Sequence, residues 1–321
     1  SKKLFRYRIT LILFLISMMN FSVNDETSKL ISVIIGIANN SGGIPKLKDL
    51  YDPKSIENLK SGKYPLESNM VNQLENFSNI LIKYGVDVFR PKNVDNCNQI
   101  FVRDVGFVIE NYFFKSNILP KRDKEFDGIK SILNNFKRDF LINIPSEIHI
   151  EGGDVLTIDD NIFIGYYNKE DYSNLFTART NKEAVTYFEN FFPLKNIKAF
   201  HLRKSNNDPL NNVLHLDCCI QLVGFDKAII YPDAFTNRDD YEWLKSFFGL
   251  ENIYEINNIE MYEMNSNVLS INKKVVVSDP SFYRLNNWLE SQGFVVEKVD
   301  FSEVSKQEGL FRCSSLPLIR N

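Results

Sequence analysis

The sequence has few of the cysteines and histidines that form disulfide bonds or bind structural metals in small folds. Its 321 residues include three histidines and four cysteines, with no pair of cysteines at the two-residue separation typical of zinc sites. The cysteines, Cys97, Cys218, Cys219 and Cys313, are too few and too unevenly spaced for a disulfide framework. We therefore expect no structural metal and a reducing compartment, with the adjacent Cys218 and Cys219 serving as packing residues.

An excess of one charge is also missing. Lysine and arginine number 38, aspartate and glutamate 41, and the formal net charge is -3, which argues against a nucleic-acid partner. Hydrophobic residues make up 44% of the chain, enough for a substantial globular core.

Long apolar runs are scarce as well. The segment 9–19 follows a basic stretch and has the outline of a secretory signal, but it is too short to span a bilayer comfortably. No small-residue cleavage pattern follows it, and Met18 or Met19 would make natural starts. We therefore predict that residues 1–28 are an N-terminal extension of a cytoplasmic protein without membrane association. Export through a true signal is the alternative.

From residue 29 onward, helical and strand-like segments alternate. Apolar spacing predicts helices, each followed by a short strand. The predicted helices span 66–84, 126–140, 182–192, 238–248 and 281–292. The strands after them span 86–89, 147–150, 197–202, 252–256 and 294–299.

Between these segments, apolar pairs predict β-hairpins. They span 105–114, 155–165, 213–231 and 268–277, and a fifth would pair 310–319 with 31–38. Units that repeat at roughly 43 to 60 residues are typical of radial architectures, and pairing the two ends removes the open sheet edge. We therefore predict one α/β domain over 29–321, a ring of five strand and helix units. An ordinary α/β sandwich is the alternative.

Two segments contain residues suited to covalent catalysis. Cys313 lies among apolar residues near the end of the sequence, where it could equally be a buried structural cysteine. A cysteine nucleophile needs a base or cation close by. His215 alternates with Asp217 in an apolar run, and a period of two would place both side chains on one face of a strand.

Two further segments place carboxylates among apolar residues. Glu151 and Asp154 bracket a glycine pair, where a backbone can approach a ligand closely, although a solvated hairpin turn would also fit. Asp104 follows Arg103 in a strand-like run, where a buried ion pair between them is the alternative. Because an unpaired buried charge is costly, these segments together with the cysteine and histidine predict an active site.

The motifs resemble those of the guanidino-group-modifying superfamily, which contains arginine deiminases, dimethylarginine dimethylaminohydrolases and amidinotransferases. The resemblance covers about residues 30–321 and implies the pentein fold, a five-fold pseudosymmetric α/β propeller. The matching segments are Arg103-Asp104, Glu151-Gly152-Gly153-Asp154, Arg179-Thr180-Asn181, His215-Leu216-Asp217 and Arg312-Cys313-Ser314-Ser315-Leu316-Pro317-Leu318.

By this resemblance, Cys313 is the nucleophile, His215 the general acid and base, and Glu151 the carboxylate that orients the imidazole. Attack of the Cys313 thiolate on a guanidinium carbon would give a covalent S-amidino intermediate, which water or an amine then attacks.

The resemblance also implies a substrate site. Asp104 and Asp217 would hold the guanidinium with Asp154 nearby, Arg179 would bind an α-carboxylate, and Asn212 would belong to the same site. The expected partner is a small guanidino substrate, with no cofactor and no metal, and homo-oligomerisation is left open.

The motifs favour a hydrolase of the arginine deiminase or dimethylargininase type, with an amidinotransferase as the alternative. A catalytically inactive pentein that only binds a ligand is a third interpretation. The segment His215-Leu216-Asp217 is similar to arginine deiminases and amidinotransferases, whereas dimethylarginine hydrolases have a lysine in place of the aspartate. The segment Gln307-Glu308-Gly309-Leu310 departs from the two or three glycines that many relatives carry before the nucleophile.

Overall fold

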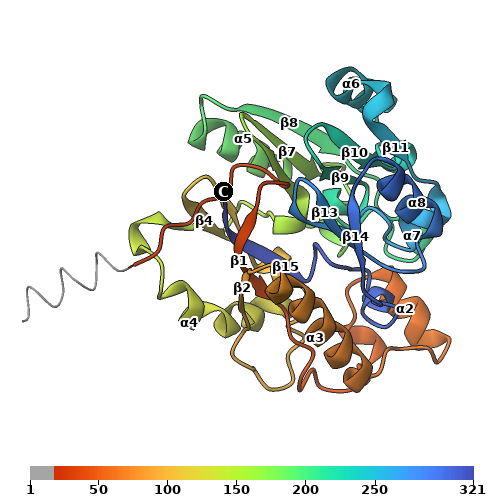
Figure 1. Cartoon of the computed structure of the whole chain (residues 1–321). Coiled ribbons are helices and arrows are strands. Elements are labelled where there is room, and N and C mark those ends of the chain that lie inside the picture. The colour runs from red at the N-terminus through yellow and green to blue at the C-terminus, as the bar shows by residue number, and fades with distance from the viewer. Residues whose placement is uncertain (1–17) are drawn as a thin grey trace, which may run out of the picture.

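Figure 1 shows a computed structural model of the chain, which describes residues 18–321. Within this range the strands form five three-stranded sheets. In every sheet the central strand pairs antiparallel with one neighbour and parallel with the other. Four sheets thus combine a hairpin with the next strand along the chain, and in the fifth the last strand pairs with the first. The predicted α/β pentein fold with five repeated units is confirmed.

The sheets use the hairpins that the sequence predicts. In spatial order the strands are β15 (Ser315–Arg320), β1 (Leu30–Ile35) and β2 (Asp87–Phe89); β3 (Gly106–Ile109), β4 (Tyr112–Lys115) and β5 (Leu141–Asn143); β6 (Val155–Ile158), β7 (Asn161–Tyr166) and β8 (Asn196–His201); β9 (Ile220–Val223), β10 (Lys227–Ile230) and β11 (Ile253–Glu255); and β12 (Leu269–Asn272), β13 (Val275–Ser278) and β14 (Val295–Lys298).

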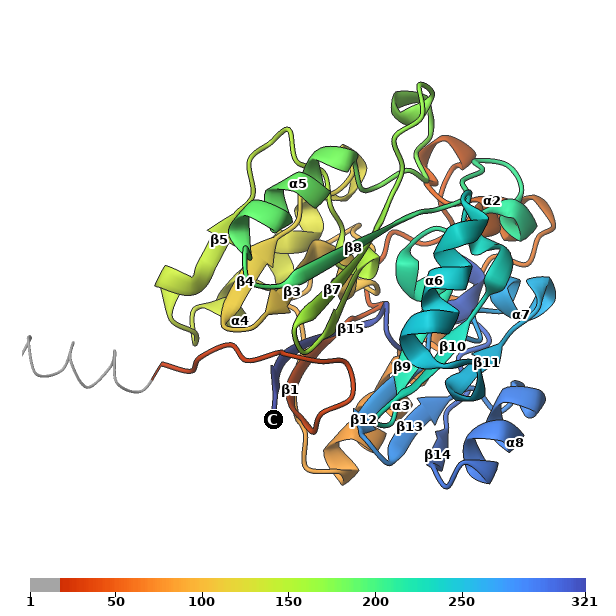
Figure 2. The same cartoon turned by 90° about the horizontal axis from the view of Figure 1, so that it is seen from above.

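Strands from the two ends of the repeat complete one sheet. β1 pairs antiparallel with β15, so that strands far apart in the sequence lie side by side (Figure 1). β15 also contacts β3, and β1 contacts β12, which places this sheet between its two neighbours. Figure 2 shows the helices outside the sheets and the successive sheets following one another around the molecule.

Four of the five predicted helices are present as long helices. The helices are α2 (Pro53–Lys60), α3 (Glu67–Lys83), α4 (Lys130–Leu133), α5 (Lys182–Phe191), α6 (Arg238–Phe248), α7 (Asn258–Tyr262) and α8 (Tyr283–Ser291). The helix predicted over 126–140 is wrong, because only the four-residue α4 and short 3₁₀ turns form there. Glycine and asparagine are weak helix formers, and this stretch contains Gly128, Asn134 and Asn135.

The strand predicted over 147–150 is also wrong. The strand that completes this sheet is β5, which lies earlier in the chain and pairs parallel with β4. Pro145 follows closely, and proline has no amide hydrogen to donate to a neighbouring strand.

Residues 18–28, which the sequence assigned to an extension, pack against the rest of the fold. The Phe21 ring is 1% exposed and stacks on Phe136 with 4.3 Å between centroids. Val23 pairs with Glu110 through two backbone hydrogen bonds. The packed fold therefore begins before the predicted boundary at 29. Residues 1–17, which include most of the signal-like run, lie outside the described range. No helix in residues 18–321 is both long and apolar enough to cross a membrane.

Candidate active site

The repeated architecture brings four of the predicted site residues together with Asn267, which the sequence did not assign to the site. Asp104, Glu151, His215, Asn267 and Cys313 each lie within a few residues before the first strand of a sheet, at β3, β6, β9, β12 and β15 respectively. The turn at 152–154 contacts both the turn at 102–105 and the turn at 216–218. Equivalent ends of the five units therefore converge on one place, although the residues are spread over some 200 positions of the sequence.

Cys313 lies in the turn before β15, which begins at Ser315, so the prediction that it belongs to the last strand is wrong. Its side chain is buried, and its amide donates to Asn267 Oδ1 at 3.0 Å. Its Sγ lies 3.7 and 3.8 Å from the two carboxylate oxygens of Asp217.

A hydrogen bond with Cys218 favours the Cys313 thiolate, but burial and the charges of Asp217 and Asp104 outweigh it and raise the pKa of Cys313. The empty site therefore holds a neutral thiol.

His215 and Glu151 form a buried acid–base pair. His215 Nε2 donates to Glu151 Oε2 at 2.6 Å, and both side chains are 1% exposed. Burial opposes protonation of the imidazole, but the charge of Asp104 and the bond to Glu151 outweigh it and raise the pKa of His215 to about 9. His215 is therefore an imidazolium at neutral pH and can act as a general acid.

The glycine pair beside Glu151 allows this arrangement. A Cβ on Gly153 would lie 2.7 Å from His215 Cγ, and a Cβ on Gly152 would lie 2.1 Å from the Arg103 carbonyl oxygen. Neither position has room for a side chain, so the backbone approaches the imidazole directly.

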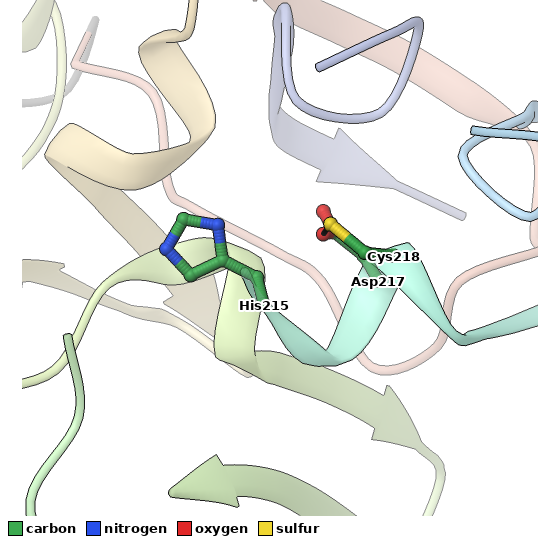
Figure 3. A group of neighbouring side chains, drawn as sticks. All are labelled: His215, Asp217 and Cys218. Carbon is green, nitrogen blue, oxygen red and sulfur yellow. Dashed lines mark hydrogen bonds between the residues drawn. The ribbon is translucent and has the colours of Figure 1, made fainter. Parts of the chain in front are cut away.

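His215 and Asp217 do not alternate along a strand. Asp217 lies within a 3₁₀ turn over Leu216–Cys218, and His215 is the N-cap residue of this turn. Figure 3 shows the imidazole and the carboxylate on the same side of this turn, with the Cys218 sulfur beside the carboxylate. The predicted common face therefore exists, but a turn produces it. Cys218 and Cys313 both lie beside the Asp217 carboxylate, so Cys218 adjoins the site instead of serving only as packing.

The two predicted guanidinium-binding carboxylates each already pair with an arginine. Arg122 Nη1 lies 2.9 Å from Asp104 Oδ2, and Arg312 Nη1 lies 2.9 Å from Asp217 Oδ2. Asp104 Oδ1 has no hydrogen-bond partner within residues 18–321. Arg103 Nε donates to the carbonyl of Arg312 at 3.2 Å and not to Asp104, so the simple Arg103–Asp104 ion pair is not found in this range.

Two buried arginines, Arg122 and Arg179, also border the site. Arg179 Nη1 lies 2.9 Å from Glu151 Oε2, and its Nη2 donates to the Tyr51 carbonyl at 2.7 Å. Arg122 and Arg179 both lie against the Tyr51 ring, at 5.4 and 5.7 Å from its centroid. The sequence did not single out Arg122, because it belongs to a charged run typical of a solvated surface, yet it is only 3% exposed.

Asp154 and Asn212 support the site from behind. Asp154 accepts hydrogen bonds from Thr180 Oγ1 at 2.6 Å and from the Leu216 amide at 2.9 Å, and so holds the turn that carries the histidine. Asn212 Nδ2 donates to Glu308 Oε1 at 2.8 Å. The structure does not place either residue in the wall of the cavity beside Cys313.

A small closed cavity of about 10 Å³, room for roughly one water molecule, lies between these groups. Its walls are Tyr51, Asp52, Phe101, Asp104, Arg122, Arg179, Leu214, His215, Gln307, Glu308 and Cys313. An amino-acid substrate must therefore displace part of this wall to reach the thiol.

Two groups of side chains have atoms of metal-ligand type within 4.8 Å of one another. They are His215, Asp217 and Cys218, and Asp104, Glu151 and His215. Their three carboxylates already pair with buried arginines, which neutralise the charge that a metal ion would require. We assign no metal to them.

Comparison with known proteins identifies the family. Residues 56–320 match the family described as "N,N dimethylarginine dimethylhydrolase, eukaryotic". The chain belongs to this family. It is also 31% identical over 223 residues to the uncharacterized protein YkgA of Bacillus subtilis (strain 168), which covers 69% of this chain and 70% of YkgA.

Solved structures agree on the fold. The substrate-bound N-terminal domain of ArgZ, a cyanobacterial arginine dihydrolase, has a TM-score of 0.74 at 16% identity, over 90% of this chain and 98% of that one. The amidinotransferase SxtG from Microseira wollei has a TM-score of 0.73 at 17% identity, over 94% and 97%. The predicted guanidino-modifying pentein superfamily is confirmed, and these findings support an enzyme that is a guanidino-group hydrolase or amidinotransferase.

Replacing Glu151 with glutamine is expected to lower the pKa of His215 by about 1 to 3 pH units, because it removes an adjacent negative charge and a charge-assisted hydrogen bond. An NMR titration of the ring measures this pKa, with the signals of His149 and His201 as internal references. Glu147→Gln removes an exposed acid from the same segment and serves as the control. An unchanged His215 pKa would show that Glu151 does not set its protonation.

Proposed function

We propose that the protein is a cysteine-dependent hydrolase acting on the guanidino group of arginine or a substituted arginine. The observation that supports it most is one cavity whose wall contains Cys313, His215 and Asp104, with Glu151 hydrogen-bonded to His215 and Asp217 beside the Cys313 sulfur. The presence of all these groups also argues against the inactive, ligand-binding alternative.

We place the guanidinium of the substrate between the two aspartates. A guanidinium presents N–H donors in a planar fork that carboxylates match. Asp104 Oδ1 has an unused acceptor site, and the Asp217 oxygens lie within 3.8 Å of Cys313 Sγ. A cation bound here lies next to the thiol and favours its thiolate. The substrate would thereby lower the cysteine pKa that burial and the aspartates raise in the empty enzyme.

The proposed reaction has two halves. In the first, Cys313 releases its proton to solvent when the cation binds, and the thiolate adds to the guanidinium carbon. The C–N bond to the departing amine then breaks as His215 donates its proton to that amine, which leaves an S-amidino group on the sulfur. In the second, His215 accepts a proton from water as the water attacks the same carbon. Breaking the C–S bond then restores the cysteine and releases a urea-type product, citrulline when ammonia or a methylated amine was the leaving group.

Arg122 and Arg179 are suited to the other end of an amino-acid substrate. Both guanidinium groups are buried, both lie against Tyr51, and both border the cavity that holds the thiol. Arginine binds a carboxylate through two parallel hydrogen bonds. We assign the α-carboxylate of the substrate to these two residues, where it would take the place of Glu125, which now accepts from Nε and Nη2 of Arg122 at 2.7 and 2.9 Å.

An amidinotransferase would use the same first half-reaction, with an amine in place of water in the second. To separate the two, the enzyme is incubated with L-arginine or Nω,Nω-dimethylarginine, with and without glycine, and products and acid-quenched protein are analysed by mass spectrometry. We expect citrulline without glycine and an S-amidino adduct on Cys313. Ornithine and a new guanidino compound that form only with glycine would mean transfer. No reaction with any guanidino amino acid would contradict the proposal.

A further inference from the structure

Two buried carboxylates in the cavity wall differ from the carboxylates that pair with arginines in and around the site. Asp52 and Glu308 are 4% and 6% exposed, and both border the cavity that holds the thiol. Asp104, Glu151 and Asp217 each lie 2.9 Å from an arginine nitrogen. Within residues 18–321, neither Asp52 nor Glu308 has a side-chain nitrogen of arginine, lysine or histidine within 4.0 Å. Two buried acids thus face the site without an ion-pair partner.

Neutral donors hold this acid pair in place. Asp52 caps the N-terminus of α2 and accepts from the Ser55 amide at 2.6 Å. Glu308 accepts from Asn212 Nδ2 at 2.8 Å and from the Lys54 amide at 3.5 Å, and both carboxyl groups border the same cavity. The nearest ammonium group, that of Lys54, is directed to the Tyr262 carbonyl at 2.7 Å.

The acid pair holds a proton in the empty enzyme. Burial and the neighbouring charge of Asp52 raise the pKa of Glu308 to about 8, although Lys54 opposes this, and burial raises the pKa of Asp52, although Arg179 opposes it. Burying an unpaired charge is costly, and a shared proton avoids the cost. A bound cation could take the place of that proton.

Other groups in the same wall also await a ligand. Asp104 Oδ1 and His215 Nδ1 are buried, and they lack hydrogen-bond partners in the part of the chain that the structure describes. The guanidinium of the proposed substrate would donate to Asp104 Oδ1 near Cys313. The His215 Nδ1–H, itself a donor, lies 3.7 Å from the same oxygen. Asp52 and Glu308 lie in the same wall as Arg122 and Arg179, to which we assigned the α-carboxylate.

We propose that Asp52 and Glu308 bind the α-ammonium group of the amino-acid substrate and so select amino acids over guanidines that lack it. This inference rests on the proposed function. An α-ammonium group is one carbon away from the α-carboxylate, and Arg179 donates to the carbonyl of Tyr51, the residue directly before Asp52. A substrate whose carboxylate reaches Arg179 thus brings its ammonium group to the acid pair, where it displaces the shared proton.

Kinetics with a matched pair of substrates test this assignment. L-arginine and 5-guanidinopentanoate differ only in the α-amino group. Glu308→Gln keeps the acceptor for Asn212, and Asp52→Asn keeps a good helix cap, so both variants are expected to fold. Each should raise the KM for L-arginine about tenfold or more, the loss expected for a hydrogen bond between charged groups. The KM for 5-guanidinopentanoate should stay within about twofold of that of the wild type by the same reasoning.

Asp49→Asn is the control, because it removes an exposed acid three positions from Asp52. It should leave both KM values unchanged. A pH series gives a second readout that a purely structural role would not change. In the wild type, the KM for L-arginine should fall as the pH rises through about 8, because the acid pair loses its proton around this pH. Glu308→Gln should flatten this dependence.

The outcomes separate this inference from the function on which it rests. If the wild type consumes L-arginine but neither variant changes the ratio of the two KM values, the acid pair does not bind the α-ammonium group, and the proposed function stands. If the variants instead weaken only the use of added glycine, the pair binds an acceptor amine and the assignment is wrong. If the wild type consumes neither guanidine, both proposals fail together.

Discussion

Cys313→Ala is expected to lower the turnover of a guanidino substrate by ~10⁴-fold or more, because nothing else in the cavity can form the covalent bond to carbon. Alanine removes only the sulfur, so the packing of Phe311 and the β15 strand should persist. Steady-state turnover measures the loss, and calorimetry with L-arginine should still detect binding to the variant.

Cys97→Ala is the matched control for this experiment. Cys97 is also a buried free cysteine, but it is not part of the cavity wall beside His215. The activity of the Cys97→Ala variant should equal that of the wild type. Normal activity in Cys313→Ala, or an S-amidino adduct on another cysteine, would rule out the proposed nucleophile.

Glu26→Ala is expected to reduce the free energy of unfolding by about 3–5 kcal/mol, the usual effect of breaking a buried ion pair. Arg312 is completely buried, and its Nε and Nη2 bond to the two oxygens of Glu26 at 3.1 and 3.0 Å. Without Glu26, this guanidinium keeps Asp217 as its only carboxylate partner in the described chain. Chemical denaturation monitored by fluorescence measures the change.

The control is Asp127→Ala, which breaks a solvent-exposed pair with Lys130 and should cost less than about 1 kcal/mol. The pH gives a further check. Burial opposes ionisation of Glu26, but the charge of Arg312 outweighs it and lowers its pKa from 4.5 to about 2. Its stabilising contribution is therefore present above pH 4.5 and is lost as the pH falls toward 2. A difference between wild type and Glu26→Ala that does not shrink in acid would contradict the ion-pair explanation.

The features that the sequence predicts correctly depend on local chemistry. Turns such as Gly224-Phe225-Asp226 connect the two strands of a hairpin, and here the glycine adopts a positive φ of 69°. The helix over 238–248 begins at Asn237, a capping residue, and ends before Gly249. Because such signals repeat from unit to unit, the five-fold architecture follows from short segments considered one at a time.

The features that the sequence misses depend on partners far away along the chain. Arg122 is one of several charged residues in its segment, and only the folded structure buries it against Asp104. Glu26 lies in a segment assigned to an extension, and its partner Arg312 is 286 positions away. Glu308 departs from the expected glycine, and its importance becomes visible only beside Asp52. In each case the neighbour in space is not a neighbour in sequence.

The pairing of β1 with β15 has a consequence for how the protein is made. The nucleophile and the arginine that neutralises Glu26 and Asp217 lie next to β15, so a ribosome releases them after nearly all of the other units. Until then, a nascent chain has an open edge at β1 and buried carboxylates without their cation. Contacts of such high sequence separation form slowly. We therefore expect catalytic competence to appear only after translation of β15, at the same time as the final cooperative gain in stability.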